Sequence, residues 1–496
     1  MKLADIFSKI SANFKVVGTI SIDKVEVLDI AIDSRLVKKG SLFFALPGEA
    51  KNGLAFIDSA IQNGAVGIIT QSFSDQIPQD VLAIESQSPT ILLAEMLKVF
   101  NAPLPDNIYT VTGTNGKTSV AEFTRQIFKF LGKKAASIGT LGVVCDEISQ
   151  DQLQSSALTT PDIVSLYKNL HSLKRFEVED AIIEASSIGL KQGRMNGLDI
   201  DVAAFTNFTQ DHIDYHGSML EYFRCKMMLF DQAINSETVA VLNSDIKEFS
   251  TIKETFLKKG HKIIEYGLKA ADLKLTDIAK RHDGQFISFE YLGHKYQFNL
   301  SVDGEFQAFN VLCALGIILA KKDLNHIELQ ALISQFSLLK SALGRMQHVV
   351  SLENKAQIFI DFAHTPDALE NVLKLARKLT QSRVLVLFGC GGDRDAKKRP
   401  VMGKIACDLA DLVIVTDDNP RSENPKIMRS DIIAGCDQSK IIEISNRKTA
   451  IEKSMQMLEE SDILILAGKG HEKYQIIGEI KHDFDEELIV KNALTK

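Results

Sequence analysis

The amino-acid sequence predicts an α/β fold with three domains, the last two of them doubly wound around mostly parallel sheets. Runs of Val, Ile and Leu without alternation, such as VLVLF at 384–388 and LVIV at 412–415, are typical of parallel strands that helices cover on both faces. Such runs alternate with helix-like stretches such as PDALENVLKLARKL at 366–379. The length of 496 residues corresponds to roughly two to four domains of ordinary size, which leaves room for this organisation.

The first domain is expected over residues 1–105, where short strand-like runs alternate with turn residues. The segment NAPLPDN at 101–107 contains two prolines among polar residues and is typical of a linker. A strand, a glycine-containing loop and a helix follow from Ile108. We therefore predict a central domain over 106–336.

Further strands of the central domain are predicted at 181–186 and 202–208, and a helix at 303–320 has apolar residues at roughly helical spacing. After Gly344 the alternation of strands and helices begins again. This pattern predicts a C-terminal Rossmann-like domain over 337–496.

The composition disfavours several classes of protein. Apolar residues make up 45% and charged residues 24% of the chain, as in globular proteins and unlike disordered or collagen-like chains. The net charge of −7 argues against a general nucleic-acid binder or a polybasic membrane-surface binder. No apolar run reaches the ~18–20 residues of a membrane span, and MKLADIFSKISANFKV lacks the apolar stretch of a secretory signal. Because the six cysteines include no CxxC pair, we expect free thiols and a cytoplasmic location.

A phosphate-binding loop is predicted at GTNGKT, residues 113–118, between a strand and a helix. It is a shortened form of the GxxxxGK[ST] pattern, because its first glycine is three positions before the second. Glycines let backbone N–H groups turn towards phosphate oxygens, and the helix N-terminus adds its dipole. Lys117 can reach the β- and γ-phosphates, and Thr118 can bind Mg²⁺. The alternative is an ordinary strand–turn–helix connection with a surface lysine.

A second centre of charge is predicted around Glu184, which ends an apolar strand where a carboxylate without a cation would be costly. Downstream, a short stretch contains Asp211, His212, Asp214 and His216, and Lys226 follows on a predicted helix. Carboxylates and imidazoles suit Mg²⁺ or Mn²⁺ when phosphate supplies further oxygens. The alternatives are hydrogen-bonded structural histidines and a lysine that extends to solvent.

An ordered set of motifs resembles the Mur ligase family. The likeness runs from Asp33 to Glu472, nearly the whole chain. In chain order the motifs are TGTNGKTS, EASSIGLKQGR, TNFTQDHIDYHGSM, NSD, GEFQAFN, GRMQ, DFAHTPDALENVL, GCGGDRDAKKRPVMG, DNPR and AGKGHE. The third motif continues, with gaps, through YF, Lys226 and LF. The order and spacing of the ten motifs make a chance match implausible.

The resemblance implies an ATP-dependent amide ligase of cytoplasmic peptidoglycan precursor synthesis, and a monomer. ATP would phosphorylate the D-glutamate γ-carboxylate of UDP-N-acetylmuramoyl-L-alanyl-D-glutamate. The amine of meso-2,6-diaminopimelate would then attack the acyl phosphate, giving an amide, ADP and phosphate. The family has an N-terminal UDP-binding domain, a central ATP-binding domain and a C-terminal amino-acid-binding domain. We expect neither a nucleic-acid partner nor a membrane span.

The resemblance also assigns residues to these steps. The catalytic residues would be Lys117, Glu184, His212 and Lys226, with Lys226 modified to N6-carboxylysine (a carbamate). The Mg²⁺ ligands would be Thr118, Glu184, His212 and the Lys226 carbamate. ATP would contact Gly113, Thr114, Asn115, Gly116, Lys117, Thr118, Ser119, Asn310, Arg345, Asp361 and His364. The UDP-linked substrate would contact Ser34, Thr159, Thr160, Ser186, Gln192, Arg194 and Lys226.

Diaminopimelate would bind where loops meet at the carboxyl edge of the last sheet. The residues implied are Arg394, Asp418, Asn419, Pro420, Arg421, Gly468 and Glu472. The guanidinium of Arg421 can pair with the second carboxylate of this amino acid, and carboxylates can accept from its ammonium. On residue chemistry alone, Ser34 and Arg421 could instead be turn residues and His364 a structural histidine.

Four places depart from the common family pattern, one of them KNG at 51–53, which replaces a frequent D-G. Ile188 and Gly193 stand where many relatives have histidine, and Gln307 stands where asparagine is common. None lies at a predicted metal, phosphate or DNPR position. The alternatives are a lysine-adding Mur ligase, a folylpolyglutamate synthetase-like ligase, and a nucleotide-gated binding protein without transfer chemistry. Because nucleotide and amino acid would bind to different domains, joined near residue 336, we also expect domain closure.

Overall fold

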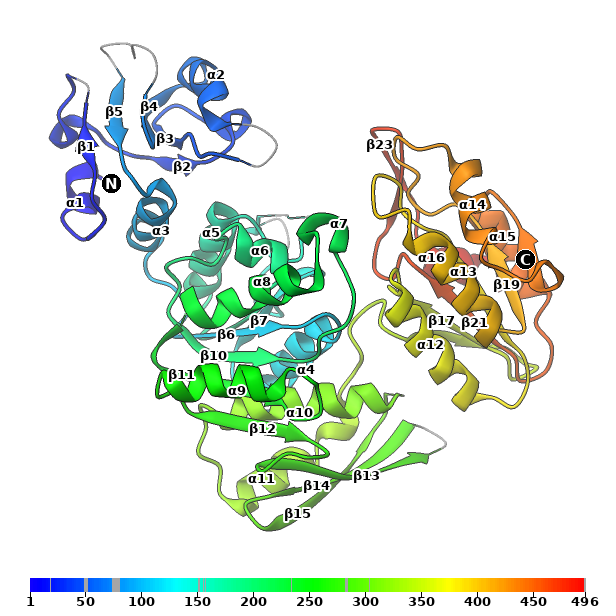
Figure 1. Cartoon of the computed structure of the whole chain (residues 1–496). Coiled ribbons are helices and arrows are strands. Elements are labelled where there is room, and N and C mark those ends of the chain that lie inside the picture. The colour runs from blue at the N-terminus through cyan, green and yellow to red at the C-terminus, as the bar shows by residue number, and fades with distance from the viewer. Residues whose placement is uncertain are drawn as a thin grey trace.

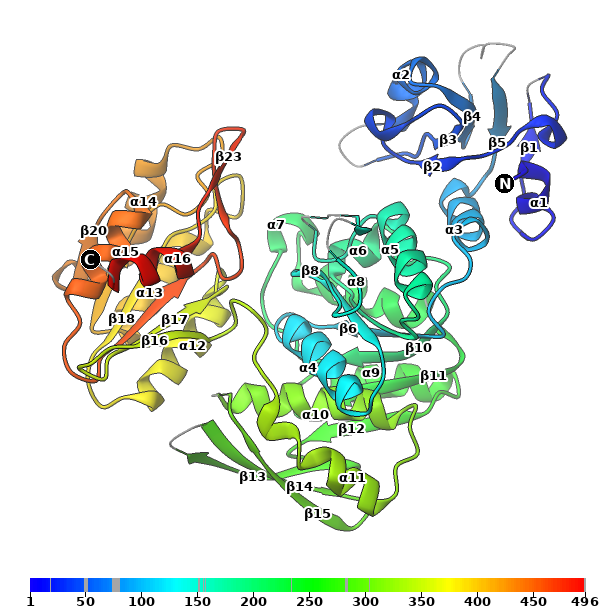
Figure 2. The same ribbon diagram turned by 180° about the vertical axis from the view of Figure 1, so that it is seen from behind.

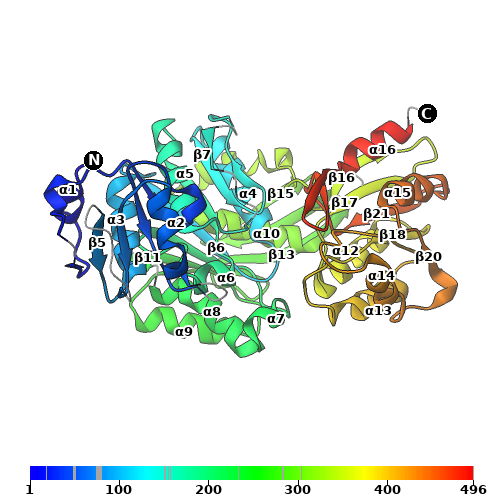
Figure 3. The same cartoon turned by 90° about the horizontal axis from the view of Figure 1, so that it is seen from above.

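The computed structural model describes residues 1–17, 19–48, 52–73, 81–149, 152–154, 156, 158–232, 234–281, 284–302 and 304–494. Three bodies follow one another along the chain (Figure 1). Seen from above, the N-terminal and C-terminal bodies lie at opposite ends, with the central body between them (Figure 3).

The N-terminal body is built on a mainly parallel sheet with the strand order β1-β5-β4-β3-β2. Its edge strand β1 pairs antiparallel with β5. The strands are β1 (Lys15–Val16), β2 (Asp29–Ala31), β3 (Ser41–Phe44), β4 (Ala65–Thr70) and β5 (Leu82–Glu85). The helices are α1 (Leu3–Phe7) and α2 (Ile57–Gln62), with short 3-10 turns at Ile22–Lys24, Ser34–Leu36 and Gly53–Phe56. Helix α3 (Pro89–Phe100) connects this body to the central one (Figure 1).

The central body contains a long sheet with the order β15-β14-β13-β12-β11-β10-β6-β9-β7-β8. The strands are β6 (Asn107–Thr112), β7 (Ala135–Gly139), β8 (Gly142–Val144), β9 (Asp180–Glu184), β10 (Ile200–Phe205), β11 (Ile234–Asn243), β12 (Ile263–Gly267), β13 (Leu273–Arg281), β14 (Gly284–Tyr291) and β15 (His294–Leu300). Strands β7, β9, β6, β10, β11, β12 and β13 are parallel, whereas β8, β14 and β15 pair antiparallel at the two ends.

Helices cover both faces of this sheet. They are α4 (Lys117–Phe130), α5 (Ile163–Arg175), α6 (Ser187–Lys191), α7 (Ile213–His216), α8 (Met219–Gln232), α9 (Phe249–Lys258), α10 (Glu305–Leu319) and α11 (His326–Ile333), with a 3-10 turn at Phe336–Leu338. Ala181 and Ile183 of β9 belong to one apolar core with α5, α8 and α9, whereas Ile182 belongs to another with α4 and α10. The view from behind shows α4 and α10 together on the second face (Figure 2).

The C-terminal body repeats this arrangement around the order β16-β17-β21-β18-β19-β20, parallel except for β16. The strands are β16 (Gln347–Ser351), β17 (Gln357–Asp361), β18 (Val384–Phe388), β19 (Leu412–Val415), β20 (Ile441–Glu443), β21 (Ile463–Ala467) and the hairpin β22 (Tyr474–Ile477) and β23 (Ile480–Asp483). The helices are α12 (Pro366–Leu379), α13 (Lys398–Leu409), α14 (Pro425–Ile433), α15 (Arg447–Gln456) and α16 (Glu486–Leu494), with a 3-10 turn at Gln438–Lys440.

The predicted α/β class is confirmed. The run VLVLF forms β18, whose alternate residues enter different cores, as the absence of polar alternation predicted. The helix predicted at 303–320 is α10, from Glu305 to Leu319. The antiparallel extension β14–β15 was not among the predicted elements. Here apolar and polar residues partly alternate, because one face packs on the core and the other is exposed.

Candidate active site

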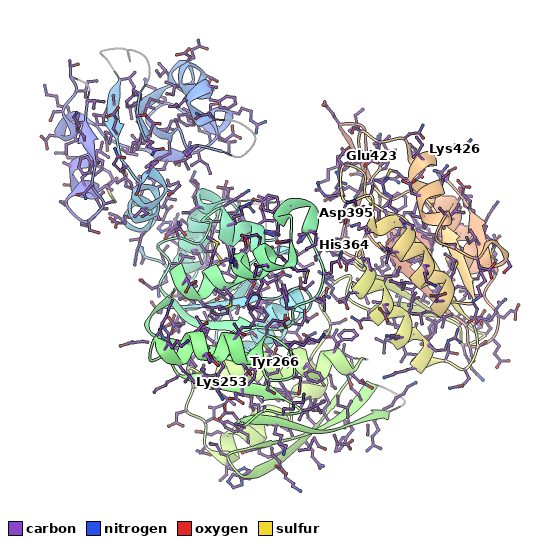
Figure 4. The ribbon with its side chains drawn as sticks, viewed as in Figure 1. Lys253, Tyr266, His364, Asp395, Glu423 and Lys426 are labelled. Atoms are coloured by element: carbon purple, nitrogen blue, oxygen red, sulfur yellow. The ribbon has the colours of Figure 1, made fainter. Side chains whose placement is uncertain are left out.

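A cavity of about 1950 Å³ lies between the central and C-terminal bodies. Its walls include residues from both, among them Asn115, Lys117, Thr118, Thr159, Glu184, Ser186, His212, Lys226, Asn310, Arg345, Asp361, His364, Arg394, Asp418, Asn419, Arg421, Gly468 and Glu472. His364 and Asp395 lie on the side of the C-terminal body that faces the central body (Figure 4). The cavity therefore joins the predicted phosphate loop to the predicted amino-acid pocket in one space.

The loop between β6 and α4 requires glycine at both ends. Gly113 has φ +142°, and a Cβ there would lie 1.9 Å from Thr206 Oγ1. Gly116 has φ +87°, and a Cβ there would lie 2.5 Å from Asn310 Oδ1. Asn207 fixes the loop between them, because its Oδ1 accepts from the Asn115 backbone N–H at 2.8 Å. The backbone is thus shaped for the close approach of a phosphate at the start of α4.

Lys117 lies across this loop. Its Nζ donates to the carbonyl oxygens of Gly113 at 2.8 Å and Thr114 at 2.7 Å. Burial lowers the pKa of Lys117, Glu184 and Asp211 oppose that change, and Arg345 adds to it. The side chain is held by neutral carbonyl groups that an anion can replace as a partner.

Glu184, at the end of β9, is 2% exposed. Its carboxylate accepts from Thr118 Oγ1 at 2.9 Å, from the Thr140 backbone N–H at 2.8 Å and from Thr140 Oγ1 at 3.2 Å. Burial raises the pKa of Glu184, although Lys117 and these hydrogen bonds oppose that change. A buried carboxylate beside a threonine hydroxyl provides oxygen donors of the kind that Mg²⁺ prefers.

Lys226 on α8 is buried to 1% exposure. Its Nζ donates to the Gly113 carbonyl at 2.7 Å and lies 4.4 Å from the centroid of the Tyr222 ring. Burial and then the charge of Lys117 hold the pKa of Lys226 well below its ordinary value. The interpretation of Lys226 as a lysine that extends to solvent is therefore wrong, because α8 directs it into the cavity wall beside the phosphate loop.

The two histidines of the 211–216 stretch differ in environment. His212 has φ +51°, lines the cavity, and lies with Nε2 3.4 Å from Asp211 Oδ2. His216 is buried, with Nε2 2.9 Å from Ser187 Oγ, which agrees with the structural alternative for this residue. Burial raises the pKa of Asp211, but His212, His364 and Lys117 outweigh burial and lower it overall. The side chain of Asp214 lies outside the described residues.

Residues from α10 and the C-terminal body close the nucleotide end. Asn310 Nδ2 donates to Gln307 Oε1 at 2.9 Å, so the longer amide at 307 supports a residue at the loop. Arg345 Nη2 donates to Thr118 Oγ1 at 3.2 Å, and its guanidinium lies over the Phe362 ring. An arginine from the C-terminal body thus reaches the residue predicted to bind Mg²⁺.

Asp361 ends β17 and His364 lies three residues beyond it; their pKa values shift in opposite directions, and burial is the largest cause of both shifts. Burial raises the pKa of Asp361 to about 6, although Arg345 and the Met346 backbone N–H oppose it. Burial and the charge of Lys398 lower the pKa of His364 to about 4. His364 Nδ1 lies 2.8 Å from the Phe362 carbonyl oxygen, so the ring is fixed at the cavity wall.

Apart from Lys226, which lines the cavity, the residues predicted to bind the UDP-linked substrate divide into three groups. Thr159 and Ser186 line the cavity, and the Ser186 hydroxyl also caps α6 by accepting from the Gly189 backbone N–H. Thr160, Gln192 and Arg194 do not line it: Arg194 donates to the Thr160 carbonyl at 2.6 Å and to Gln192 Oε1 at 2.6 Å. Ser34 is buried in the 3-10 turn of the N-terminal body. The cavity therefore brings only part of this predicted set together.

The predicted amino-acid pocket lies at the carboxyl edge of the C-terminal sheet. Arg394, Asp418, Asn419, Arg421, Gly468 and Glu472 line the cavity, whereas Pro420 does not. Arg421 has φ +51° and donates from Nη1 to the Gly392 carbonyl at 2.7 Å. Gly468 is required because a Cβ there would lie 2.7 Å from Asp418 Oδ2. Cationic and anionic side chains thus face one space, as a zwitterionic ligand requires.

Some residues of the site were not among those predicted from the sequence. Thr140 holds Glu184, Tyr222 lies against Lys226, and Lys469 is fully buried among the acidic groups of the pocket. Lys469 lies within AGKGHE, so a signal was present. Its contacts depend on β22, which no motif marked.

Among the described residues, no three His, Cys, Asp or Glu side chains gather as a metal-binding group. In the same part of the chain, no helix has the length and apolar character needed to cross a membrane.

Family models match along most of the chain. The Mur ligase family catalytic domain matches residues 26–102, the Mur ligase middle domain residues 111–318, and the Mur ligase glutamate ligase domain residues 344–470. The UDP-N-acetylmuramoyl-L-alanyl-D-glutamate–2,6-diaminopimelate ligase of Zymomonas mobilis is 40% identical over 94% of this chain and 95% of its own. The ligase of the same name from Caulobacter vibrioides is 38% identical over 99% and 98%.

Solved structures of other proteins superpose on all or most of this chain. A structure of a UDP-N-acetylmuramoyl-L-alanyl-D-glutamate–2,6-diaminopimelate ligase superposes with a TM-score of 0.66 at 30% identity, covering 100% of this chain and 99% of that one. A Mycobacterium tuberculosis folylpolyglutamate synthase superposes with a TM-score of 0.63 at 18% identity, covering 76% and 92%. The second likeness shows a shared fold.

Proposed function

This chain belongs to the Mur ligase family, and from that premise we propose that it is the ATP-dependent ligase that joins meso-2,6-diaminopimelate to UDP-N-acetylmuramoyl-L-alanyl-D-glutamate. The observation that carries the proposal is the cavity shared by the phosphate loop and the pocket of Arg394, Asp418, Arg421 and Glu472. This reaction belongs to cytoplasmic peptidoglycan precursor synthesis.

The reaction has two steps. An oxygen of the D-glutamate γ-carboxylate attacks the γ-phosphorus of ATP, which forms an acyl phosphate and releases ADP. The neutral amine of diaminopimelate then attacks the acyl carbon, the C–O bond to phosphate breaks, and the nitrogen loses a proton as the amide forms. Both steps bring anions together, so positioning and positive charge contribute most to the rate.

The phosphate loop and Lys117 hold the triphosphate in this scheme. An incoming phosphate oxygen replaces the carbonyl partners of Lys117, and Arg345 already reaches Thr118 from the other body. Asn310, Asp361 and His364 are assigned to the rest of the nucleotide, since they line the same cavity as the phosphate loop. Thr159, Ser186 and Arg194 are assigned to the UDP-linked substrate, with Ser34 binding from the N-terminal body.

Mg²⁺ fits the buried oxygen donors of this site. Thr118 and Glu184 are 2.9 Å apart, and the burial that raises the pKa of Glu184 is the cost that a cation would offset. When bound, Mg²⁺ neutralises charge on the phosphate oxygens. His212 and Lys226, as a carbamate, complete the proposed ligand set. The Lys226 amine would form the carbamate by attacking CO₂ and losing a proton.

Incorporation of labelled amino acids tests the proposal. Purified protein with ATP, Mg²⁺ and the UDP-dipeptide should incorporate diaminopimelate and release phosphate only when all substrates are present. Incorporation of lysine but not diaminopimelate would instead identify a lysine-adding ligase. Phosphate release that ignores both acceptor substrates would indicate a nucleotide-gated protein without transfer chemistry.

A further inference from the structure

A buried lysine lies directly behind the amino-acid pocket and is not one of its walls. Lys469 is 0% exposed and is absent from the lining of the cavity, although its neighbours Gly468 and Glu472 belong to it. Its Nζ donates to Asn419 Oδ1 at 3.0 Å and to the Tyr474 carbonyl at 2.7 Å. Two neutral acceptors therefore use two of its three N–H groups.

The same ammonium lies between two carboxylates of the pocket. Nζ is 3.8 Å from Asp418 Oδ1 and 3.6 Å from Glu472 Oε2. These distances allow attraction but exceed those of direct hydrogen bonds. Both carboxylates can thus be held in place and still accept hydrogen bonds from a ligand in the cavity.

Lys469 also orients the amide of Asn419. An ammonium has no acceptor, so the Asn419 atom facing it must be the oxygen. The Ile476 backbone N–H donates to the same oxygen at 2.9 Å. The Asn419 Nδ2 then points the other way and donates to Glu472 Oε2 at 2.9 Å. A chain of contacts runs from the buried ammonium through Asn419 to a carboxylate at the cavity.

Asp418 is held from its other side by Arg447. This arginine is 0% exposed, pairs with Glu486 at 2.8 Å, and lies with Nη1 3.8 Å from Asp418 Oδ2. That Nη1 is buried without a hydrogen-bond partner among the described residues. Asp418 therefore lies between two buried cations, Lys469 and Arg447, and each is 3.8 Å from one of its carboxylate oxygens.

We propose that Lys469 is a positioning residue of the amino-acid pocket, which fixes Asp418, Asn419 and Glu472 in the arrangement that receives the distal ammonium of diaminopimelate. This inference rests on the function proposed above and extends it to a residue that does not touch the substrate. Removing the charge should leave the carboxylates to repel each other and the Asn419 amide free to turn. Affinity for the amino acid should fall, whereas the ATP site should be unaffected.

The test is the Lys469→Met variant with all three KM values measured. We expect the diaminopimelate KM to rise at least about tenfold, because buried charge-assisted contacts are worth that much or more, with the KM values for ATP and the UDP-dipeptide within about twofold. The matched control is Lys473→Met, since Lys473 lies in the same segment but is 74% exposed. An unchanged diaminopimelate KM, or an equal rise in all three, would overturn the positioning role.

A second variant guards against misfolding. Lys469→Gln removes the charge but keeps a donor for the buried acceptors, and thermal unfolding is recorded for both variants. If Lys469→Met does not fold, the selective rise must appear in Lys469→Gln. Wild-type protein is assayed first: failure to incorporate diaminopimelate rejects the proposed function and this extension together, whereas a normal wild type with no selective effect rejects only the role of Lys469.

Discussion

Lys226 is a lysine whose environment disfavours its own charge. It is 1% exposed, and its Nζ has a carbonyl oxygen and a tyrosine ring as neighbours. An ammonium in this position would repel Mg²⁺ and Lys117, whereas a carbamate would attract both. The burial of Lys226 therefore favours the proposed modification to a carbamate.

We expect Lys226→Ala to lower kcat by on the order of a hundredfold or more, because a charged group at the reacting phosphates is lost. A small carboxylic acid added to the assay should restore part of the activity by supplying the missing carboxylate. Arg224→Ala is the control, since Arg224 is on the same helix but 64% exposed. Normal activity of Lys226→Ala would contradict the assignment.

Arg421 occupies a constrained position in the pocket. Its backbone has φ +51°, and its backbone N–H donates to the Ile476 carbonyl. Its guanidinium donates one N–H to the Gly392 carbonyl. We expect Arg421→Ala to raise the diaminopimelate KM at least about tenfold through loss of a carboxylate partner, with a much smaller change for ATP. Steady-state kinetics with each substrate varied in turn measures both. An unchanged diaminopimelate KM would remove Arg421 from the pocket.

Asp361 gives a prediction about pH. Its pKa is about 6 in the folded protein against 3.8 for the free side chain, so folding disfavours the ionised form. At pH values below both pKa values the carboxyl is protonated in the folded and the unfolded protein, and the cost of ionising it is absent. At pH values above the folded pKa the full cost destabilises the wild type. The stability of Asp361→Asn relative to wild type should therefore increase by about 2 kcal/mol between pH 4 and pH 7. Urea unfolding at each pH measures the difference, and a pH-independent difference would contradict the prediction.

At the scale of elements, the phosphate loop depends on a glycine that begins α4. A Cβ at Gly116 would lie 2.5 Å from Asn310 Oδ1, so alanine would displace a side chain at the loop. We expect Gly116→Ala to weaken ATP binding at least about tenfold, because the backbone could no longer approach phosphate. Titration calorimetry with ATP measures this.

The opposite end of α4 provides the matched control. Gly132 has φ +69°, but a Cβ there would have nothing within 4 Å. Gly132→Ala should therefore lower stability by about 1 kcal/mol through backbone strain alone and leave ATP affinity unchanged. Equal loss of ATP affinity in both variants would show that strain, and not crowding at the loop, is responsible.

At the scale of the whole molecule, polar contacts connect the C-terminal body to the central one. Asp367, at the start of α12, accepts from Asn115 of the phosphate loop and from Thr209 Oγ1 at 3.2 Å. Lys378, at the other end of α12, pairs with Glu305 at 2.5 Å. The helix thus spans the junction across which the expected domain closure would occur.

We expect the double variant Asp367→Ala, Lys378→Ala to increase the radius of gyration in solution without nucleotide, measured by small-angle scattering. The exposed Lys378–Glu305 ion pair contributes only about 0.2–1 kcal/mol, and the hydrogen bonds to the half-buried Asp367 about 0.5–1.5 kcal/mol each, so thermal stability should fall by no more than a few kcal/mol. Lys374→Ala is the control, because Lys374 pairs with Glu370 within α12 itself. An unchanged radius would show that other contacts hold the two bodies together.

The sequence by itself determined the α/β class and the family. The class depends on apolar runs that become buried strands, and the family on ten motifs whose order along the chain can be read without the structure. The domain boundaries and the roles of the site residues remain predictions, as do Mg²⁺ and the modification of Lys226.

Only the tertiary structure decided which of the predicted residues meet. On residue chemistry alone Lys226 could extend to solvent or be buried according to the rotation of α8, and only the resemblance to the family favoured the second. Lys469 acquires its role from Asn419 and Tyr474, of which the first is 50 residues away. Burial and charge pairing depend on groups that are distant along the chain, so spacing alone could not reveal them.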